Sequence, residues 1–72
     1  MTLDNLKIGR SGVITAVGGD GALRRRLLDM GLTPKTRVMV RKVAPLGDPM
    51  ELTVRGYELS VRRGDAELIE VQ

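Results

Sequence analysis

A single segment of the chain, Asp20–Pro34, has the period of an α-helix, and this feature restricts the possible folds more than any other. Leu23, Leu27 and Met30 recur at intervals of four and three residues, which places them on one face of a helix. A helix with one apolar face must bury that face against another element. Because no other segment shows this period, the strand-like remainder of the chain has to cover it.

Both ends of this helix are marked in the sequence. Asp20 is a good N-cap, because its carboxylate accepts hydrogen bonds from the free N–H groups of the first turn. Gly31 stands where helices often end with a residue at positive φ, a conformation that costs a residue with a Cβ about 1–2 kcal/mol. In such an ending the next residue, Leu32, folds back onto Leu27. The sequence therefore predicts one helix between Asp20 and Met30.

The remainder of the chain consists of short strand-like segments separated by turn residues. The predicted strands are Ser11–Val17, Thr36–Val43, Met50–Val54, Tyr57–Val61 and Leu68–Val71, preceded by one turn near the N-terminus. Five short strands and one helix are too few for a two-layer sandwich. We expect an all-β single domain over residues 1–72: a small five-stranded barrel, closed so that no strand edge is exposed, with the short helix between its first and second strands.

Alternation of apolar and polar residues predicts which side chains face the core. In the first strand, Val13 and Val17 are expected on one face, and Ile14 and Ala16 on the other. Arg55–Gly56 is predicted to form a tight hairpin turn, although Asn or Asp would suit its first position better. In the strand that follows, the residues expected to face inward are Tyr57, Leu59 and Val61.

The chain contains no cysteine and no histidine. It therefore lacks the commonest metal ligands and the commonest general base, and we predict that it is not an enzyme. Carboxylates suitable for hard cations are present but form no known ligand spacing; they are Asp20, Asp29, Asp48, Glu51 and Glu58. We expect no certain cofactor, and only weak binding of a divalent transition metal such as iron or manganese.

The distribution of charge narrows the possible partners. The net charge is +3, and between Arg24 and Lys42 there are seven basic residues and one acid. Such a stretch is typical of nucleic-acid binding, but Tyr57 is the only aromatic residue available for stacking on bases. We therefore favour a solvated basic face and expect no nucleic-acid partner. No apolar run is long enough to cross a membrane, so we expect a cytoplasmic protein without direct membrane insertion.

The predicted helix carries more than its packing requires. The basic cluster Arg24-Arg25-Arg26 is a candidate for contact with an acidic or phosphate-bearing site of a partner, and a solvated helix face is the alternative. Leu28 lies well round the helix from the apolar stripe. It either packs against a second element or is exposed for a partner; the first is favoured, since interior leucines outnumber exposed functional ones.

The loop Ala44–Pro49 carries a second surplus feature. Leu46 is an apolar residue in a proline-containing loop, and apolar loop tips often make contacts. The alternative is that Leu46 folds back onto the barrel. With Met50, where the loop enters the next strand, the candidate partner-binding residues are Arg24, Arg25, Leu28, Leu46 and Met50.

The run RLLDMGLTP, from Arg26 to Pro34, resembles the RLLDLGLTPG signature of the FeoA family, the small accessory proteins of bacterial ferrous-iron transport. The resemblance continues in order to the end of the chain, through residues 44–49, Val54–Tyr57, Leu59, Ala66–Glu67 and Ile69–Val71. Two positions depart from the family pattern. Lys35 replaces the glycine that usually follows the proline, and Val61-Arg62-Arg63 stands where a leucine-arginine pair is usual.

This resemblance implies an SH3-like barrel and a cytoplasmic role beside FeoB, a membrane transporter with a cytosolic GTPase domain. FeoA-like domains also occur at the C-terminus of iron- and manganese-dependent repressors. The alternative function is therefore a metal-responsive regulatory domain, although no ligand set carries over to residues of this sequence. Because the sequence shows no helix-turn-helix between Met1 and Gln72, we favour the transport accessory role.

Overall fold

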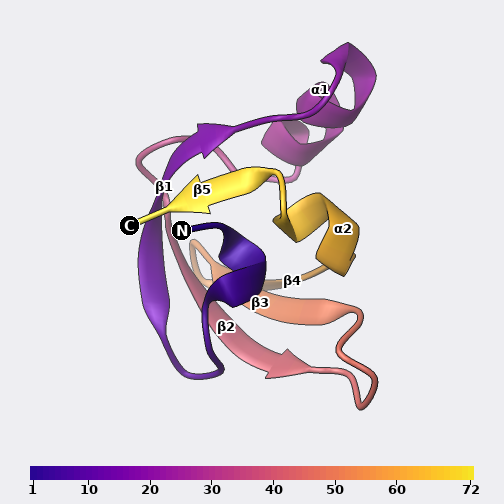
Figure 1. Cartoon of the computed structure of the whole chain (residues 1–72). Helices are drawn as coiled ribbons and strands as arrows, with labels where there is room; N and C mark the ends of the chain where they lie inside the picture. Colours follow the sequence, from indigo (N-terminus) through magenta and orange to yellow (C-terminus); the bar gives the residue numbers. More distant parts are fainter.

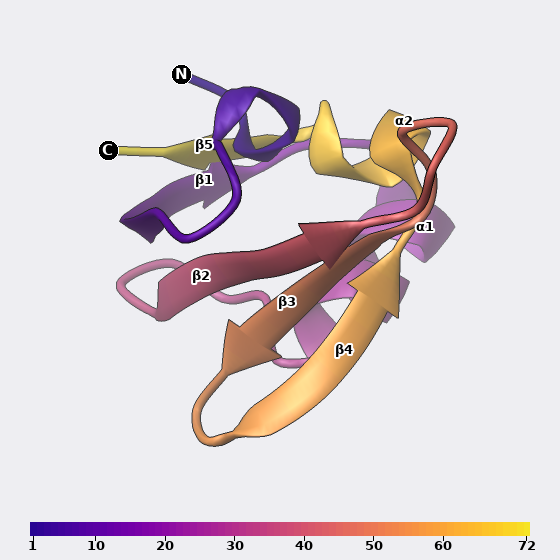
Figure 2. The same ribbon diagram turned by 90° about the horizontal axis from the view of Figure 1, so that it is seen from below.

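One antiparallel β-sheet forms most of the molecule (Figure 1). The computed structural model describes every residue from 1 to 72. The strands are β1 (Ser11–Val17), β2 (Arg37–Val43), β3 (Met50–Val54), β4 (Tyr57–Val61) and β5 (Ile69–Val71). Their order is β4-β3-β2-β1-β5, and the sheet curls strongly on itself (Figures 1 and 2). The predicted mainly β fold with five strands and one short helix between the first two is confirmed.

The curled sheet is not closed by hydrogen bonds. β4 and β5 are edge strands at the two ends of the strand order, so the expectation that closure removes every edge is wrong. The 3₁₀ turn η1 (Leu3–Asn5) and the one-turn helix α2 (Arg63–Ala66) contact each other, and η1 also contacts β5. Both lie between β5 and β3 in Figure 1. Covering a sheet edge with other elements is an alternative to closure.

The core lies inside the curl and gathers apolar side chains from every strand. β2 contributes Val38 and Val40, and β3 contributes Met50, Leu52 and Val54. All five are fully buried, as strict alternation predicts. These two strands therefore have one face in the core and one face directed outward.

β1 departs from alternation. Ile14 and Val17 are both buried, whereas Ala16 is exposed and Val13 is half-buried. The pairing of β1 with β5 shifts register between Ile14 and Ala16, which marks a β-bulge. Because the extra residue of a bulge reverses the direction of the side chains beyond it, the predicted pairing of Val13 with Val17 on one face is wrong.

The helix α1 (Gly21–Asp29) begins as predicted. The carboxylate of Asp20 accepts a hydrogen bond of 2.9 Å from the backbone N–H of Leu23. Leu27 is fully buried in the core, and Leu23 and Met30 are half-buried against it. The apolar stripe of the helix therefore covers one end of the curled sheet.

The end of α1 is also as predicted. Gly31 has a φ of +98°, and the backbone N–H of Leu32 donates to the carbonyl oxygen of Leu27 at 3.2 Å. The structure adds a neighbour that the sequence did not indicate. A Cβ on Gly31 would lie 2.1 Å from the hydroxyl oxygen of Tyr57, so glycine is required here for space as well as for conformation.

The hairpin between β3 and β4 turns at Arg55 and Gly56, with φ of 50° and 85°. Two successive positive values are typical of a two-residue type I′ turn, so the predicted tight turn is confirmed. Val61 faces the core, but Tyr57 is 43% exposed, so its predicted inward position is wrong. Its hydroxyl donates to the carbonyl oxygen of Met30 at 2.7 Å, which draws the ring to the end of α1.

Two strands begin one residue later than predicted, β2 and β5. Thr36 and Leu68 still belong to the preceding turns, because their N–H groups donate to the carbonyl oxygens of Thr33 and Asp65. The segment before β5, expected as a turn, is the one-turn helix α2. Neither helix combines the length and the apolar character needed to span a membrane.

Candidate functional site

Three elements form one end of the molecule: α1, α2 and the β2–β3 loop, residues 44–49. We call this the helical end. Figures 1 and 2 show the three elements at the same end in two views, with α2 between α1 and the loop. The Arg26 guanidinium of α1 lies 3.4 Å from the carboxylate of Asp65 in α2. The sequence predicts that α1 and this loop contact a partner. In the structure both lie at the helical end, and α2 joins them.

The loop is held at its base by α2. The carboxylate of Asp48 accepts a hydrogen bond of 3.0 Å from the backbone N–H of Arg63, and the Arg63 guanidinium donates to the carbonyl oxygen of Gly47 at 3.3 Å. Within the loop, the N–H of Ala44 donates to the carbonyl oxygen of Pro49 at 3.0 Å. These bonds leave the loop tip free, and Leu46 at that tip is 97% exposed. Leu46 therefore does not fold back onto the sheet.

The arginines of α1 differ in how their charges are used. The Nε of Arg24 donates to the carbonyl oxygen of Val17 at 2.9 Å, which fixes α1 to the end of β1. Arg26 forms the pair with α2 described above. Arg25 is exposed, and its side chain makes no hydrogen bond or ion pair within the chain. Arg25 is therefore the arginine of this run with its whole charge available.

Two of the five candidate residues, Met50 and Leu28, are not exposed, whereas the other three are. Met50 is 1% exposed and belongs to the core, so its inclusion as a surface contact was wrong; strict alternation in β3 turns it inward. Leu28 is half-buried and packs against the core, which agrees with the favoured interpretation of that residue. The surface candidates that remain prominent at the helical end are Arg24, Arg25 and Leu46.

Sequence reasoning missed the role of α2. Four residues are too few to show a helical period, so nothing in the local pattern distinguishes Arg63–Ala66 from an ordinary turn. Its two contacts with α1 and the loop join residues far apart in the chain, and only the fold brings them together.

The carboxylates considered as metal ligands do not converge on a common site, and four of them bond to groups of the protein itself. Asp20 caps α1, and Asp48 accepts from α2. Glu51 and Glu58 pair with Lys42 and Arg41 on the sheet; these are the two ion pairs of the sheet's outer face. The structure brings together no group of three or more His, Cys, Asp or Glu residues that could hold a metal ion.

The model of the FeoA domain family matches residues 1–72. The chain belongs to the FeoA domain family. A relative from Porphyromonas gingivalis (strain ATCC BAA-308 / W83), an Fe(2+) transport protein A/Fe(2+) transporter FeoB fusion protein, is 40% identical over 72 residues. These residues are 100% of this FeoA domain but only 8% of the fusion protein.

Solved structures share the fold closely. The FeoA protein from Chlorobium tepidum is 43% identical with a TM-score of 0.92, over 100% of this chain and 69% of that one. FeoA from Stenotrophomonas maltophilia complexed with zinc, a procaryotic SH3 domain protein, is 26% identical with a TM-score of 0.86, over 100% and 89%. A manganese-dependent transcriptional repressor in complex with manganese has a TM-score of 0.91 at 16% identity, over 100% and 35%, and shares the fold alone. The expected SH3-like fold is confirmed.

Proposed function

We propose that this FeoA domain is a cytoplasmic accessory protein of ferrous-iron transport that binds the cytosolic, GTPase-containing part of a FeoB-like transporter. The observation that carries the proposal is the fusion of the two proteins in the Porphyromonas gingivalis relative. A covalent link keeps two domains at high effective concentration, which is advantageous when the separate domains also have to associate. The proposed role is binding and regulation, without catalysis by the FeoA domain itself.

The helical end is the surface we assign to this interaction. Leu46 offers an apolar anchor on a loop whose base is fixed by α2, so little ordering entropy is lost when it binds. Arg25 offers a cation that is free of internal partners, and Arg24 adds charge beside it. Arginine and apolar anchors are what the energetic centres of protein interfaces contain. An apolar anchor and cations at the same end of the molecule suit an acidic partner surface that also offers an apolar pocket.

The test is calorimetric titration of the full chain against the cytosolic domain of a FeoB-like transporter. Leu46→Ser should weaken binding by about ten- to a hundredfold, because the burial of one leucine side chain is worth about 1.5–3 kcal/mol. Leu46→Met keeps an apolar tip and is the matched control, expected to bind like the parent. Unchanged affinity in Leu46→Ser and in Arg25→Glu, with both variants folded by circular dichroism, would place the interface elsewhere.

A second candidate function is a metal-responsive regulatory domain. It is supported by the zinc in the Stenotrophomonas maltophilia FeoA structure. Without His or Cys, this chain offers first-row transition metals only oxygen and thioether donors, which bind them weakly. Titration with ferrous iron or manganese distinguishes the two functions. Affinity in the millimolar range is expected for the accessory role, and submicromolar binding to the isolated chain would favour the regulatory one.

A further inference from the structure

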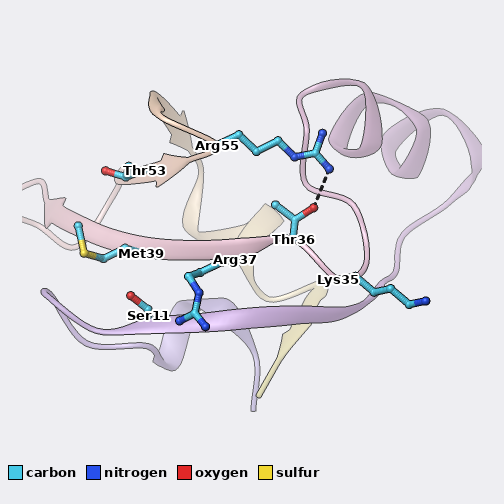
Figure 3. Close-up of a pocket in the computed structure, with 7 residues that line it drawn as sticks. All are labelled: Ser11, Lys35, Thr36, Arg37, Met39, Thr53 and Arg55. Carbon is cyan, nitrogen blue, oxygen red and sulfur yellow. Dashed lines mark hydrogen bonds between the residues drawn. The ribbon is translucent and has the colours of Figure 1, made fainter.

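The outer face of the sheet carries a polar hollow, and none of the residues that line it belongs to the helical end (Figure 3). Strand register explains its composition. Ser11 pairs with Met39 and Met39 pairs with Thr53, so these three side chains form one row across β1, β2 and β3. Arg37 lies on the same face of β2, two residues before Met39, and Arg55 follows the end of β3 beside it. The hollow measures about 550 Å³.

The positive charge of this hollow is not neutralised by the acids nearby. Two acids lie on the same outer face, Glu58 directly opposite Thr53 and Glu51 two residues before Thr53. Each forms an ion pair with a base farther along β2, Glu58 with Arg41 and Glu51 with Lys42. None of the ion pairs of the chain involves a cation of the hollow. Those cations are Lys35, Arg37 and Arg55.

Arg55 is held in place by neutral partners. One nitrogen of its guanidinium donates to the hydroxyls of Thr33 and Thr36, at 2.9 Å each. Thr36 is 6% exposed, and its hydroxyl is also within 2.8 Å of that of Thr33. Because a guanidinium has five N–H donors, the others remain free for a ligand while the group is already oriented. Orientation by neutral hydroxyls fixes the cation without neutralising it.

The backbone has positive φ at two of the three cations of the hollow, at Arg55 as part of the type I′ turn described above. Lys35 and Arg55 are the two residues other than glycine with positive φ in the whole chain, at 75° and 50°. At Lys35 the positive φ raises the free energy of the fold, and residues held in this way are often found at binding sites. Figure 3 shows Arg55 and Arg37 on opposite sides of Thr36, and Lys35 extending outward at one end. The two arginines therefore flank the hollow, and Lys35 contributes charge from its rim.

From this arrangement we infer that the hollow binds a phosphate group, with Arg37 and Arg55 as its principal ligands. The planar fork of a guanidinium group matches the geometry of phosphate oxygens, and the hydroxyls of Ser11 and Thr53 are further donors. No aromatic residue lines the hollow, so the phosphate is recognised without stacking on a nucleobase. The shared chemistry is that of a phosphate ester, whether from a small soluble compound or from a phospholipid headgroup.

The first test is nuclear magnetic resonance titration of the isotope-labelled full chain with inorganic phosphate and pyrophosphate at low salt, against chloride at matched ionic strength. Saturable shifts are expected at the amides of Ser11, Thr36, Arg37 and Arg55, with pyrophosphate binding more tightly. Arg37→Gln should weaken binding about tenfold. Arg37 is the preferred variant, because its side chain makes no hydrogen bond or ion pair within the chain, so we expect its loss to leave the fold intact.

Arg25→Gln on α1 is the matched control, since it removes the same charge outside the hollow. It should change phosphate affinity less than twofold. Shifts spread over the whole basic surface, or an equal loss in Arg25→Gln, would overturn the proposal, as would the absence of saturation. Arg55→Lys keeps the positive charge but removes the guanidinium. If this variant binds phosphate as tightly as the parent does, the planar guanidinium of Arg55 is not what recognises the phosphate.

Flotation with vesicles of phosphatidylglycerol, against phosphatidylcholine, identifies the source of the phosphate. Saturable phosphate binding without flotation assigns the hollow to a soluble phosphate ester. Flotation with phosphatidylglycerol that Arg37→Gln abolishes and Arg25→Gln retains assigns it to a lipid headgroup. Both outcomes support the site. Flotation that Arg25→Gln abolishes and Arg37→Gln retains would count against it.

Discussion

The helical end and the outer face of the sheet both carry several cations, but they use them differently. At the helical end Arg24 donates to a backbone oxygen of β1 and Arg63 to one of the loop, and Arg26 pairs with an acid of α2, so these side chains hold the three elements to one another and to the sheet. In the hollow, Arg37 and Arg55 have no acidic partner. A basic stretch in a sequence therefore contains both structural and available charges. Only the internal contacts of each arginine separate the two kinds.

The largest effect is expected where the helical end is fixed to the sheet. Gly31→Ala would bring a Cβ to 2.1 Å from the Tyr57 hydroxyl oxygen and would hold alanine at a φ of +98°. The positive φ costs about 1–2 kcal/mol and the displaced hydrogen bond about 1 kcal/mol more. For a chain of this size, a loss of about 2–3 kcal/mol lowers the Tm by more than about 10 °C, which thermal unfolding measures.

A double variant separates the two causes. In Tyr57→Phe the hydroxyl is absent, and the nearest ring atom of residue 57 lies 3.5 Å from the new Cβ, which is ordinary contact. Gly31→Ala should therefore cost less in the Tyr57→Phe background than in the parent. Equal costs in both backgrounds would mean that the close approach of Tyr57 contributes nothing.

The next effect tests the comparison of the two surfaces directly. Arg25→Glu and Arg37→Glu make the same change of charge, one at the helical end and one in the hollow. Arg25→Glu should weaken binding to the transporter's cytosolic domain about tenfold and leave the affinity for pyrophosphate nearly unchanged. Arg37→Glu should do the reverse. If both variants lose both activities equally, the two surfaces are one diffuse basic face.

A smaller effect is expected at the start of α1. Asp20→Ala removes the carboxylate that accepts from the N–H of Leu23, and the loss of such a cap typically costs about 1 kcal/mol. Urea unfolding measures this change. Asp20→Asn keeps an acceptor oxygen at the same position and should recover most of the stability. A loss in the asparagine variant as large as in the alanine variant would argue against capping as the cause.

The sequence was sufficient for those parts of the fold that depend on local patterns. The cap at Asp20, the ending at Gly31 and the inward residues of β2 and β3 follow from neighbours a few residues apart. The bulge in β1 was not predictable, because it exists only in the pairing with β5 at the other end of the chain. The exposure of Tyr57 likewise depends on a bond to Met30 on a distant element.

The same distinction holds for the candidate surfaces. Leu46 and Arg25 could be predicted as surface candidates because neither is needed to pack its own loop or helix, and both are exposed in the structure. Met50 was included in error, since its position beside the loop was given more weight than the alternation of its strand. The hollow was not identified, because strand register and a turn bring Arg37 and Arg55 together across eighteen positions of sequence. No spacing within one segment signals such a site.

The smallest effect concerns Lys35, where the resemblance to the family leads one to expect glycine. Lys35 has a φ of 75°, which glycine adopts without steric cost. Lys35→Gly relieves that cost but adds freedom to the unfolded chain, so we expect a net gain of only about 0.5 kcal/mol. Because the Lys35 side chain extends outward at the rim of the hollow, its loss should weaken pyrophosphate binding only about twofold, and less at high salt. Urea unfolding and the phosphate titration measure the two changes on the same sample.

Lys35→Asn is the control, because asparagine tolerates positive φ and also lacks the charge. It should match the glycine variant in binding but gain less stability. If Lys35→Gly is more stable than the parent but binds pyrophosphate less tightly, the Lys35 cation contributes to binding while it lowers the stability of the fold. Tighter binding in Lys35→Gly would show instead that the lysine obstructs the hollow.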